Sequence, residues 1–514
     1  MSTRATRILC TVPDLLLRQA GPLVRKTAVV DARRRITYDE LIARSLAYAA
    51  LLKESGVRKG DRVCMFLERS VDAVALLFAT WFCGGVAVVA NANLAAPQLE
   101  HILSNSEASC LVSDGSRLRR TAEVVSRHNN VIDLDVVNPS ATSFAPERII
   151  GSDLAQIAYT AASTGPAKGV MLSHNNLLDA TRIVSDCFAI GSSDVLLSVL
   201  PFSFDYALNH LLASIATGAT IVIETSSNPA DICNTLAATP ITGLPATAAL
   251  WKEFAAEGSP FLAERYPNLR FIASSGGKLP QDSIAAIRAA HPRVKLYVLY
   301  GSTESSRSTC LFPESLDSRP GSIGKPMANI DVLVVNAAGS ACKPGEIGEL
   351  VHRGAGVAMG YWRDPVRTGR TFRPHPLQYY LNGREEIVVF SGDLVKTDED
   401  GYLYYIGRKE QQIKAKGVSM SPEEIETLIA SSNLVARVCA FGVRFEGIDD
   451  VVLAVVPREP DRFRQEDLDV FCRTRLPEHM RPRAIMRVDA LPLTPNGKAD
   501  RLRVREMFRP PSSH

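Results

Sequence analysis

Short apolar segments alternate with helix-like segments through much of this chain, and that alternation limits the possible folds more than any other feature. Residues 62–67 and 86–90 have the apolar, β-branched character of buried strands, and residues 73–82 between them are predicted to form a helix. The pattern continues in further predicted strands at 195–200, 219–223, 270–275 and 295–301. Strands joined through helices run parallel, because a tight hairpin has no room for a helix. We therefore expect an α/β fold built on parallel sheets.

The pattern changes twice toward the C-terminus. From about 320 to 406, glycines separate β-like segments such as 330–335, which predicts a smaller and more antiparallel region. Residues 407–412 are polar and are predicted to be a linker. A compact α+β unit of about a hundred residues then follows. Because 514 residues exceed the size of one ordinary core, we predict two domains, 1–407 and 408–514.

Composition excludes several classes of protein. The chain is 46% hydrophobic and 22% charged, as expected of a soluble globular protein, and its net charge of +3 gives no reason to expect nucleic acid as a partner. No apolar run approaches the roughly 20 residues of a membrane-spanning helix. The ten cysteines show no C-x-x-C pair or zinc-ligand spacing, which favours reduced thiols. We expect a cytoplasmic protein without membrane insertion.

A loop rich in small and hydroxyl residues lies between a predicted strand at 156–160 and a predicted helix start at 171–178. Small residues let the backbone approach a ligand closely, and hydroxyl and N–H groups donate to anionic oxygens. Lys168 adds a positive charge. One interpretation is a polyphosphate site, and the other is an ordinary surface turn rich in serine and glycine. It is not a Walker loop, because the GxxxxGK[ST] spacing is missing.

Polar residues also follow two apolar segments, where parallel sheets commonly bind ligands. In the segment 300–304, Tyr300 offers a face on which a base can stack, and Glu304 offers a carboxylate for Mg²⁺ on phosphate oxygens. In the triplet 391–393, Asp393 suits paired sugar hydroxyls. Taken alone, each segment is more often an ordinary exposed turn than a binding site.

Two cations stand in the last hundred residues at positions that suit phosphate or carboxylate. Arg408 lies at the predicted linker, and Lys498 lies in the stiff Pro/Gly loop 492–498. A lysine fixed by such a loop can neutralise charge that develops during a reaction. The alternative for both is a solvated surface side chain.

Together and in this order, the five clusters resemble the adenylate-forming superfamily of acyl-CoA synthetases, adenylation domains of nonribosomal peptide synthetases, and luciferase. The resemblance spans essentially the whole chain. Segments 201–211, 300–309 and 358–374 look like those of AMP-forming acyl-CoA ligases associated with bacterial exosortase gene clusters, a group close to stand-alone amino-acid-activating ligases.

The resemblance implies a large N-terminal domain of parallel α/β sheets with a β-rich subdomain, and a small mobile C-terminal α+β domain. It also implies a two-step reaction, often in antibiotic or other secondary-metabolite biosynthesis. A carboxylate first attacks the α-phosphorus of MgATP, giving an acyl adenylate and pyrophosphate. A phosphopantetheine thiol, on CoA or on a carrier protein, then displaces AMP. The C-terminal domain would swing between the steps by pivoting at Lys409 and Glu410.

The resemblance also implies a role for each matching residue. The catalytic residues would be Lys498, Thr303, Glu304 and Lys168, with Glu304 as the Mg²⁺ ligand. The residues that bind ATP or the pantetheine arm would be Ser163, Thr164, Gly165, Gly276, Tyr300, Asp393, Arg408 and Gly417.

The chain departs from the superfamily in two segments. In the phosphate loop, Ala161, Ala162 and Ala167 stand where Ser, Gly and Pro are usual, although the Ser-Thr-Gly core and the lysine are kept. After Gly417, Val418 replaces a common aromatic residue and Ser419 a common arginine, which leaves the thiol acceptor open.

The predicted acid pocket contains Asp205, Gly243, Ser275 and Arg307. Asp205 falls where amino-acid-activating relatives keep an aspartate for the substrate ammonium, and a buried carboxylate needs a cationic partner. Arg307 either binds a second carboxylate or pairs with Asp205. The leading hypothesis is ligation of a small amino or imino acid. The alternatives are a CoA synthetase for a non-amino acid and a non-catalytic nucleotide-binding relative.

Overall fold

The computed structural model describes residues 10–21, 23–137, 139, 144–160, 166–377, 385–415, 418–445, 448–493 and 499–508. Five residues with predicted roles lie outside these ranges, namely Ser163, Thr164, Gly165, Gly417 and Lys498. The chain divides into two compact units. Unit 1 contains residues 1–333 and 351–390, and unit 2 contains residues 334–350 and 391–514. The domain boundary expected at 407–408 stays a prediction.

Unit 1 contains a nine-stranded sheet in the order β15-β14-β13-β12-β11-β9-β10-β1-β2. Its six central strands, from β13 to β1, run parallel, and antiparallel strands complete both edges. The bounds are β1 (Thr27–Val30), β2 (Arg35–Thr37), β9 (Val195–Ser198), β10 (Thr220–Ile223), β11 (Gly243–Thr247), β12 (Phe271–Ser275), β13 (Lys295–Ser302), β14 (Ser306–Leu311) and β15 (Lys325–Pro326).

A seven-stranded sheet in the order β18-β8-β7-β4-β3-β5-β6 also belongs to unit 1, and its strands from β7 to β6 run parallel. Its bounds are β3 (Arg62–Phe66), β4 (Val86–Ala90), β5 (Cys110–Ser113), β6 (Val131–Asp133), β7 (Leu154–Thr160), β8 (Lys168–Ser173) and β18 (Gly360–Tyr361). The predicted parallel α/β architecture is thus confirmed in both sheets. One local difference concerns Lys168, which begins strand β8 instead of lying in a loop.

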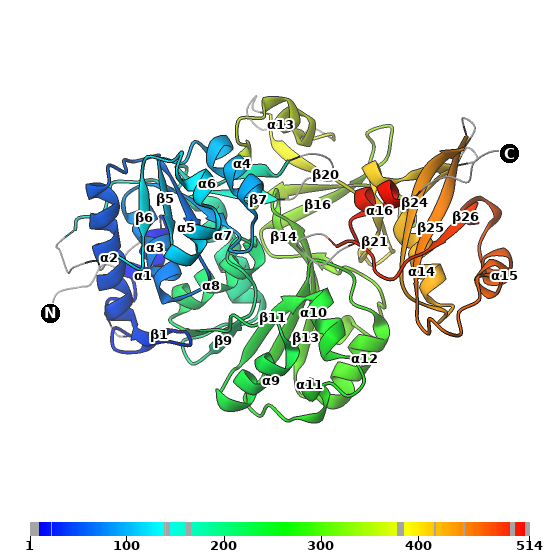
Figure 1. Ribbon diagram of the computed structural model, residues 1–514, viewed down its shortest axis with the longest axis horizontal. Coiled ribbons are helices and arrows are strands. Elements are labelled where there is room, and N and C mark those ends of the chain that lie inside the picture. Colours follow the sequence, from blue (N-terminus) through cyan, green and yellow to red (C-terminus); the bar gives the residue numbers. More distant parts are fainter. Residues whose placement is uncertain are drawn as a thin grey trace. The chain divides into compact units, whose positions relative to one another are not determined.

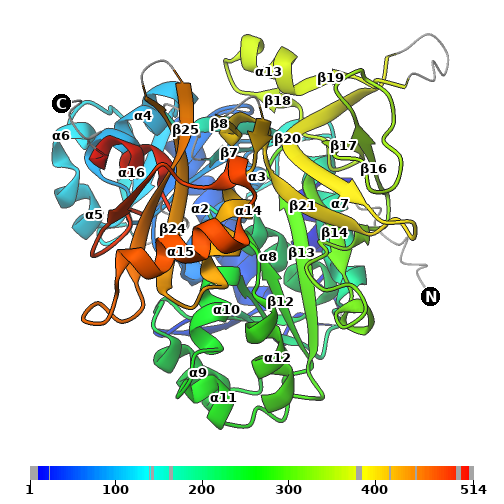
Figure 2. The same ribbon diagram turned by 90° about the vertical axis from the view of Figure 1, so that its right-hand side faces the viewer.

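The helices of unit 1 cover these sheets, and α9 to α12 gather beside β11 to β13 (Figures 1 and 2). Helices α7 and α8, which follow strands of different sheets, pack against each other. The bounds are α1 (Val12–Leu17), α2 (Tyr38–Glu54), α3 (Val71–Phe82), α4 (Ala96–Ser106), α5 (Gly115–Arg120), α6 (Ala122–Val125), α7 (His174–Cys187), α8 (Asp205–Thr217), α9 (Pro229–Ala238), α10 (Ala248–Phe254), α11 (Pro260–Ala263), α12 (Gln281–Ala290) and α13 (Pro365–Thr371).

Three strands run from one unit into the other along the chain, namely β16 (Ile330–Val335), β17 (Gly348–Gly354) and β20 (Ile387–Thr397). Within unit 1, β19 (Phe372–Pro374) pairs antiparallel with the first residues of β20. Within unit 2, β21 (Leu403–Arg408) pairs antiparallel with its last residues. The antiparallel region predicted from the glycine pattern is therefore present.

The rest of unit 2 is an α+β unit, as predicted. Strands β24 and β25 are antiparallel, β26 adds in parallel to β25, and α14 packs on β24 (Figure 2). Buried Ile425 and Ile429 of α14 and Leu453 of β25 belong to one apolar core. The bounds are β22 (Ile413–Ala415), β23 (Val418–Met420), α14 (Pro422–Ala430), β24 (Val435–Phe445), β25 (Ile448–Pro457), α15 (Gln465–Arg475), β26 (Ala484–Arg487) and α16 (Arg501–Met507).

Candidate active site

Lys168 and Glu304, 136 positions apart in the sequence, meet in an ion pair whose Nζ–Oε1 distance is 2.6 Å. The Tyr361 hydroxyl donates to the same Oε1 at 2.8 Å and accepts from the lysine Nζ at 2.9 Å. The ammonium also lies 4.6 Å from the centre of the Tyr361 ring. These three side chains form one closed network at the ends of strands from both sheets.

Strand pairing places each member of this network. β8 pairs antiparallel with β7, where Thr160 faces Lys168, and with β18, where Val170 faces Tyr361. Glu304 stands in the turn between β13 and β14. That hairpin requires Gly301, because a Cβ there would lie 2.2 Å from the Ser306 carbonyl oxygen.

The network keeps Glu304 ionised. Burial alone would raise the pKa of its carboxyl, but the Lys168 charge and the hydrogen bonds from Lys168 and Tyr361 outweigh burial, so the pKa is lowered. The pKa of the Tyr361 hydroxyl is raised, first by burial and then by the neighbouring Glu304 carboxylate. Both side-chain contacts involve the same carboxylate oxygen, Oε1. An ionised carboxylate of this kind suits a hard cation such as Mg²⁺.

Four other predicted residues lie at or near the carboxyl ends of neighbouring strands. Tyr300 lies two residues before the end of β13, and its ring stacks on His352 with a centroid distance of 6.1 Å and an interplanar angle of 18°. Ser275 is buried at the end of β12, and Gly276 follows it with φ of 78°, a conformation that favours glycine. Thr303 lies in the β13–β14 turn beside Glu304.

A second pair of charged side chains, Asp205 and Arg307, lies at the start of α8. Asp205 is the first residue of this helix and is buried, and the buried Arg307 on β14 places Nη1 3.4 Å from the Asp205 Oδ2. The Arg307 guanidinium lies 4.4 Å from the centre of the Tyr206 ring. Of the two roles expected for Arg307, the contact with Asp205 is therefore present, but at 3.4 Å it is longer than an ordinary charge-assisted hydrogen bond.

Several polar atoms beside this pair have no hydrogen-bond partner among the described residues. They are the Nε and Nη2 of Arg307, the hydroxyl of Tyr206 and the Nε2 of His210. The His210 Nδ1 lies 2.7 Å from the Tyr206 carbonyl oxygen, which can only accept, so this nitrogen carries the hydrogen. Burial lowers the pKa of His210 to about 3, against the hydrogen bond to that carbonyl, so Nε2 is an unpaired acceptor at neutral pH.

Gly243 and Ser275 lie at opposite ends of neighbouring parallel strands, and only Ser275 is at the carboxyl end. Gly243 begins β11, at the opposite end from the carboxyl edge, and pairs in register with Phe271 and Leu196. A Cβ at Gly243 would stand 2.3 Å from the Phe271 ring, so the position admits only glycine without a shift. Its predicted place in the acid pocket stays a prediction.

Unit 2 brings together the two residues predicted to hold the ribose. Asp393 and Arg408 face each other in the β20–β21 register, and the arginine Nε lies 2.7 Å from the Asp393 Oδ1. The arginine also donates from Nη1 to the Ser391 carbonyl at 3.0 Å. Asp393 is 2% exposed, so the pair is a buried carboxylate covered by a more exposed guanidinium.

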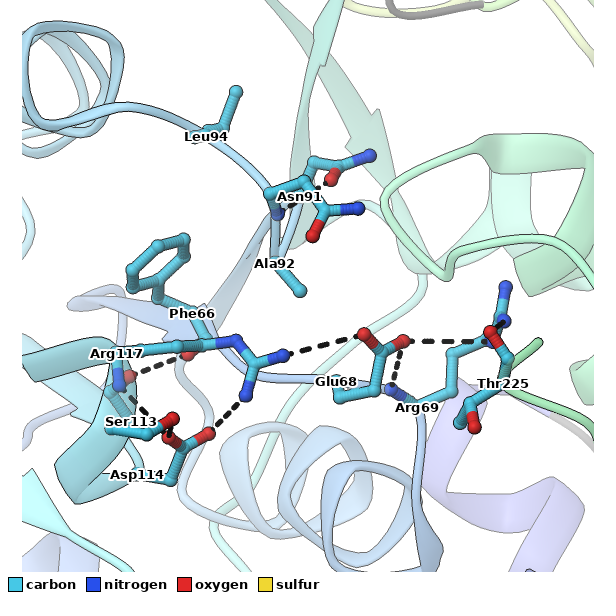
Figure 3. Close-up of polar contacts among 12 residues, drawn as sticks. Phe66, Glu68, Arg69, Asn91, Ala92, Leu94, Ser113, Asp114, Arg117 and Thr225 are labelled. Atoms are coloured by element: carbon cyan, nitrogen blue, oxygen red, sulfur yellow. Dashed lines mark hydrogen bonds and ion pairs between the residues drawn. The ribbon is translucent and has the colours of Figure 1, made fainter. Parts of the chain in front are cut away.

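None of these groups lines the cavity of about 20 Å³, which has room for about one water molecule. It is lined by the ends of β3 and β4 and by the loop after β9, including Glu68, Arg69, Asn91 and Phe202. Figure 3 shows Glu68 between Arg117 and Arg69, and Arg69 reaching toward Thr225. Arg69 donates to the carbonyls of Val199, Glu224 and Thr225. This network joins the ends of β3, β9 and β10 through ion pairs and backbone acceptors.

The family of AMP-binding enzymes matches residues 16–362, and the C-terminal domain of AMP-binding enzymes matches residues 424–498. The first match covers well over half of the chain. The chain belongs to the AMP-binding enzyme family.

Among curated relatives, this AMP-binding enzyme is 28% identical to gramicidin S synthase 2 of Brevibacillus brevis over 503 residues, which are 96% of this chain and 11% of that protein. It is also 28% identical to delta-poly-L-ornithine synthetase of Acinetobacter baumannii, covering 95% of this chain and 36% of that protein. The chain thus spans a small part of the length of the curated relatives it matches.

Among solved structures, ATP-bound MatB of Rhodopseudomonas palustris matches with a TM-score of 0.85 and 25% identity, over 96% of this chain and 98% of MatB. The anthranilate CoA ligase AuaEII in complex with anthranoyl-AMP matches with a TM-score of 0.86 and 22% identity, over 96% of each chain. The predicted superfamily and fold class are confirmed, and the family match makes the chain an AMP-binding enzyme. In the described part of the chain, no helix has the length and hydropathy needed to span a membrane.

Sequence reasoning did not identify three residues of these two groups. Tyr361 belongs to the segment 358–374, and nothing in that segment indicates that its hydroxyl joins Lys168 to Glu304. Tyr206 and His210 are one turn apart on α8, so they share a helix face with Asp205 nearby. That spacing was the available signal.

Proposed function

We propose that this protein uses ATP to convert a small carboxylic acid, one that carries an amino or imino group, into an acyl adenylate, and then transfers the acyl group to a phosphopantetheine thiol. In the first step, an acid oxygen bonds to the α-phosphorus and the bond from that phosphorus to the bridging oxygen breaks, releasing pyrophosphate. In the second, the thiolate sulfur bonds to the acyl carbon and AMP leaves. The thiol belongs to CoA or to a carrier protein.

The observation that carries the proposal is the meeting of Lys168 with Glu304 at 2.6 Å. A cation for phosphate oxygens and an ionised carboxylate for a metal stand side by side at the strand ends. ATP with Mg²⁺ fits this pair. The phosphate oxygens would contact Lys168 and Mg²⁺ would bind Glu304, and these two contacts would replace the ion pair between the side chains. Mg²⁺, when bound, neutralises charge on the phosphate oxygens.

The remaining protein groups would orient the reactants. The Tyr300 face would receive the adenine, Thr303 would donate to the α-phosphate, and Asp205 would hold the ammonium of the acid. Among the described residues no cluster of three or more metal-ligating side chains occurs. This agrees with the usual way of binding Mg²⁺ in nucleotide sites, by one or two carboxylates and the phosphates themselves.

Lys498, Ser163, Thr164, Gly165 and Gly417 lie outside the described residues, and their proposed roles rest on the family resemblance. Lys498 would contact the acid and the α-phosphate while the adenylate forms, because negative charge grows on the phosphoryl oxygens at that stage. Asp393 and Arg408 would hold the ribose hydroxyls.

The test is ATP–pyrophosphate exchange measured over a panel of amino, imino and simple carboxylic acids. We expect exchange with an amino or imino acid, reduced by about 100-fold in the Glu304→Gln and Lys498→Ala variants. Glu314→Gln, an exposed glutamate ten positions along the same segment, is the matched control and should exchange normally. Undiminished exchange by Lys498→Ala, or ATP binding without exchange for any acid, would contradict the proposal.

A second candidate is CoA ligation of an acid without an amine. It is favoured by one contact, because Arg307 already gives Asp205 a cationic partner. Asp205→Ala separates the two candidates: it should lose only amino substrates if Asp205 binds the ammonium. Release of AMP with and without added CoA then identifies CoA as the acceptor or points to a carrier protein.

A further inference from the structure

Arg307 presents one edge of its guanidinium without a partner. The Nε and Nη2 groups are buried and donate to no described residue, while Nη1 alone approaches Asp205, at 3.4 Å. The side chain is 3% exposed, so water in bulk cannot satisfy these donors. A buried cation with two unpaired N–H groups is costly, and in native proteins such groups are uncommon.

The two unpaired donors belong to the same edge of the guanidinium, and this chain shows what that edge binds. In Arg270, Nε donates to the Asp194 Oδ1 at 2.7 Å and Nη2 donates to the Asp194 Oδ2 at 2.8 Å. This is the parallel, two-bond arrangement in which arginine binds a carboxylate. The corresponding edge of Arg307 therefore has the geometry of a carboxylate site.

The surroundings favour a carboxylate over a neutral acceptor. Tyr206 holds one face of the Arg307 guanidinium at 4.4 Å, which fixes the plane of the fork. Asp205 supplies one negative charge to balance the arginine, so the couple is neutral overall. A ligand that brings one ammonium to Asp205 and one carboxylate to Arg307 leaves the pocket neutral again, with each charge paired.

We infer that the acid activated by this protein is an amino dicarboxylic acid, whose second carboxylate binds side-on to the Nε and Nη2 of Arg307. The inference rests on the proposed function and names the substrate class of the same site. The first carboxylate is the one that captures AMP, and the ammonium lies on Asp205. Arg307 is then a substrate-binding residue with no part in bond making.

The test uses pairs of acids that differ only in the second acidic group, namely glutamate with glutamine and aspartate with asparagine. Each amide matches its acid in size and shape but lacks the charge and one acceptor. We expect the kcat/KM for exchange to be about 10- to 100-fold higher for the acid of the preferred pair, the range expected of a charge-assisted double hydrogen bond. The KM for ATP should be the same for both members.

Variants of the arginine locate the effect. Arg307→Met should abolish the preference for acid over amide, and Arg307→Lys should keep part of it, because lysine keeps the charge but not the fork. Arg270→Met is the matched control: it removes an arginine that binds a carboxylate in the same unit, so the preference should be unchanged. Circular dichroism establishes that each variant is folded.

Three results would overturn the inference while leaving the proposed function intact: best exchange with a monocarboxylic acid, equal exchange with acid and amide, or an acid preference that survives in Arg307→Met. If no acid supports exchange, the proposed function fails, and calorimetric titration of glutamate and aspartate in the presence of ATP decides the inference separately. Binding that is lost in Arg307→Met but kept in Arg270→Met upholds the carboxylate site, and no binding overturns it.

Discussion

Arg270 and Arg307 both face a buried aspartate of unit 1, but their surroundings differ. Arg270 meets both oxygens of Asp194 and donates to the carbonyls of Phe188 and Ala189 as well. Arg307 reaches Asp205 with Nη1 alone, at 3.4 Å. The first pair stands just before β9 and β12, at the amino ends of parallel strands, and the second stands near the carboxyl ends.

The difference follows from what each edge of the sheet does. In parallel sheets ligands bind outside the carboxyl ends of the strands, and the amino ends serve stability. A pair that only stabilises can satisfy all its donors within the chain. A pair that binds a ligand must leave donors open for it, and this costs stability in the free protein. Asp194–Arg270 is the first kind, and Asp205–Arg307 is the second.

The largest expected effect separates the two pairs by stability. Asp194→Asn/Arg270→Met removes several charge-assisted hydrogen bonds, so the free energy of unfolding should fall by about 3 kcal/mol. Asp205→Asn/Arg307→Met removes an incompletely paired buried couple, so the free energy should stay within about 1 kcal/mol of the original or rise. Tryptophan fluorescence during urea unfolding measures both, because the three tryptophans, Trp81, Trp251 and Trp362, all lie in unit 1.

Equal losses in the two double variants would show that the Asp205–Arg307 couple is a structural ion pair like the other. Unfolding of unit 2 does not affect the measured difference, because the four substituted residues and the three tryptophans all belong to unit 1.

Much of the fold was predictable because it depends on local pattern. The apolar run 86–90 forms β4 with the predicted bounds, and the motif around Glu304 ends a strand as expected. The region after Gly165 was not predictable in the same way. Lys168 and Gly169 are poor strand formers, and only pairing of β8 with β7 and β18 makes them a strand.

The candidate site was predictable as a set of residues but not as an arrangement. Motifs indicated Lys168 and Glu304 separately, while their contact depends on two sheets that meet through long-range packing. The sequence places Asp205 and Arg307 in one predicted pocket, but it does not decide whether Arg307 pairs with Asp205 or binds a second carboxylate of the substrate. Which donors of Arg307 stay unpaired depends on the orientation of the guanidinium against Tyr206, and no sequence pattern encodes that.

A smaller effect concerns pH and tests how isolated the Arg307 pocket is. Burial and the nearby Arg307 charge hold the pKa of His210 at about 3, below its ordinary value near 6.5. Between these values the unfolded chain binds a proton that the folded protein does not, so the free energy of unfolding falls as pH drops. The contribution at pH 5 is about 2 kcal/mol, and His210→Gln should remove it.

The measurement is urea unfolding at pH 7 and pH 5 for the original protein and for His210→Gln. His174, whose pKa burial lowers to about 4, and Glu304, whose pKa is also lowered, lose stability in acid in the same direction, so the difference between the two proteins is the relevant quantity. An identical loss in both proteins would mean that His210 is accessible to protons and that the pocket is wetter than its contacts indicate.

The smallest expected effect is that of Glu68→Gln, at the cavity beside Glu68, on stability and exchange. This variant is a negative control for the Arg307 site. Glu68 contacts Arg117 at 3.3 Å and Arg69 at 3.9 Å, and its side chain is 38% exposed (Figure 3). Exposed ion pairs of this kind contribute little, so Glu68→Gln should change the free energy of unfolding by less than about 0.5 kcal/mol and leave exchange and acid preference unchanged. Arg69 keeps its three backbone acceptors in the variant, and these hold the ends of β9 and β10. A large loss of exchange in Glu68→Gln would instead place ligand binding at this cavity. Arg307 would then not be distinguished as a substrate-binding arginine from Arg69, which donates to three backbone carbonyls within the chain.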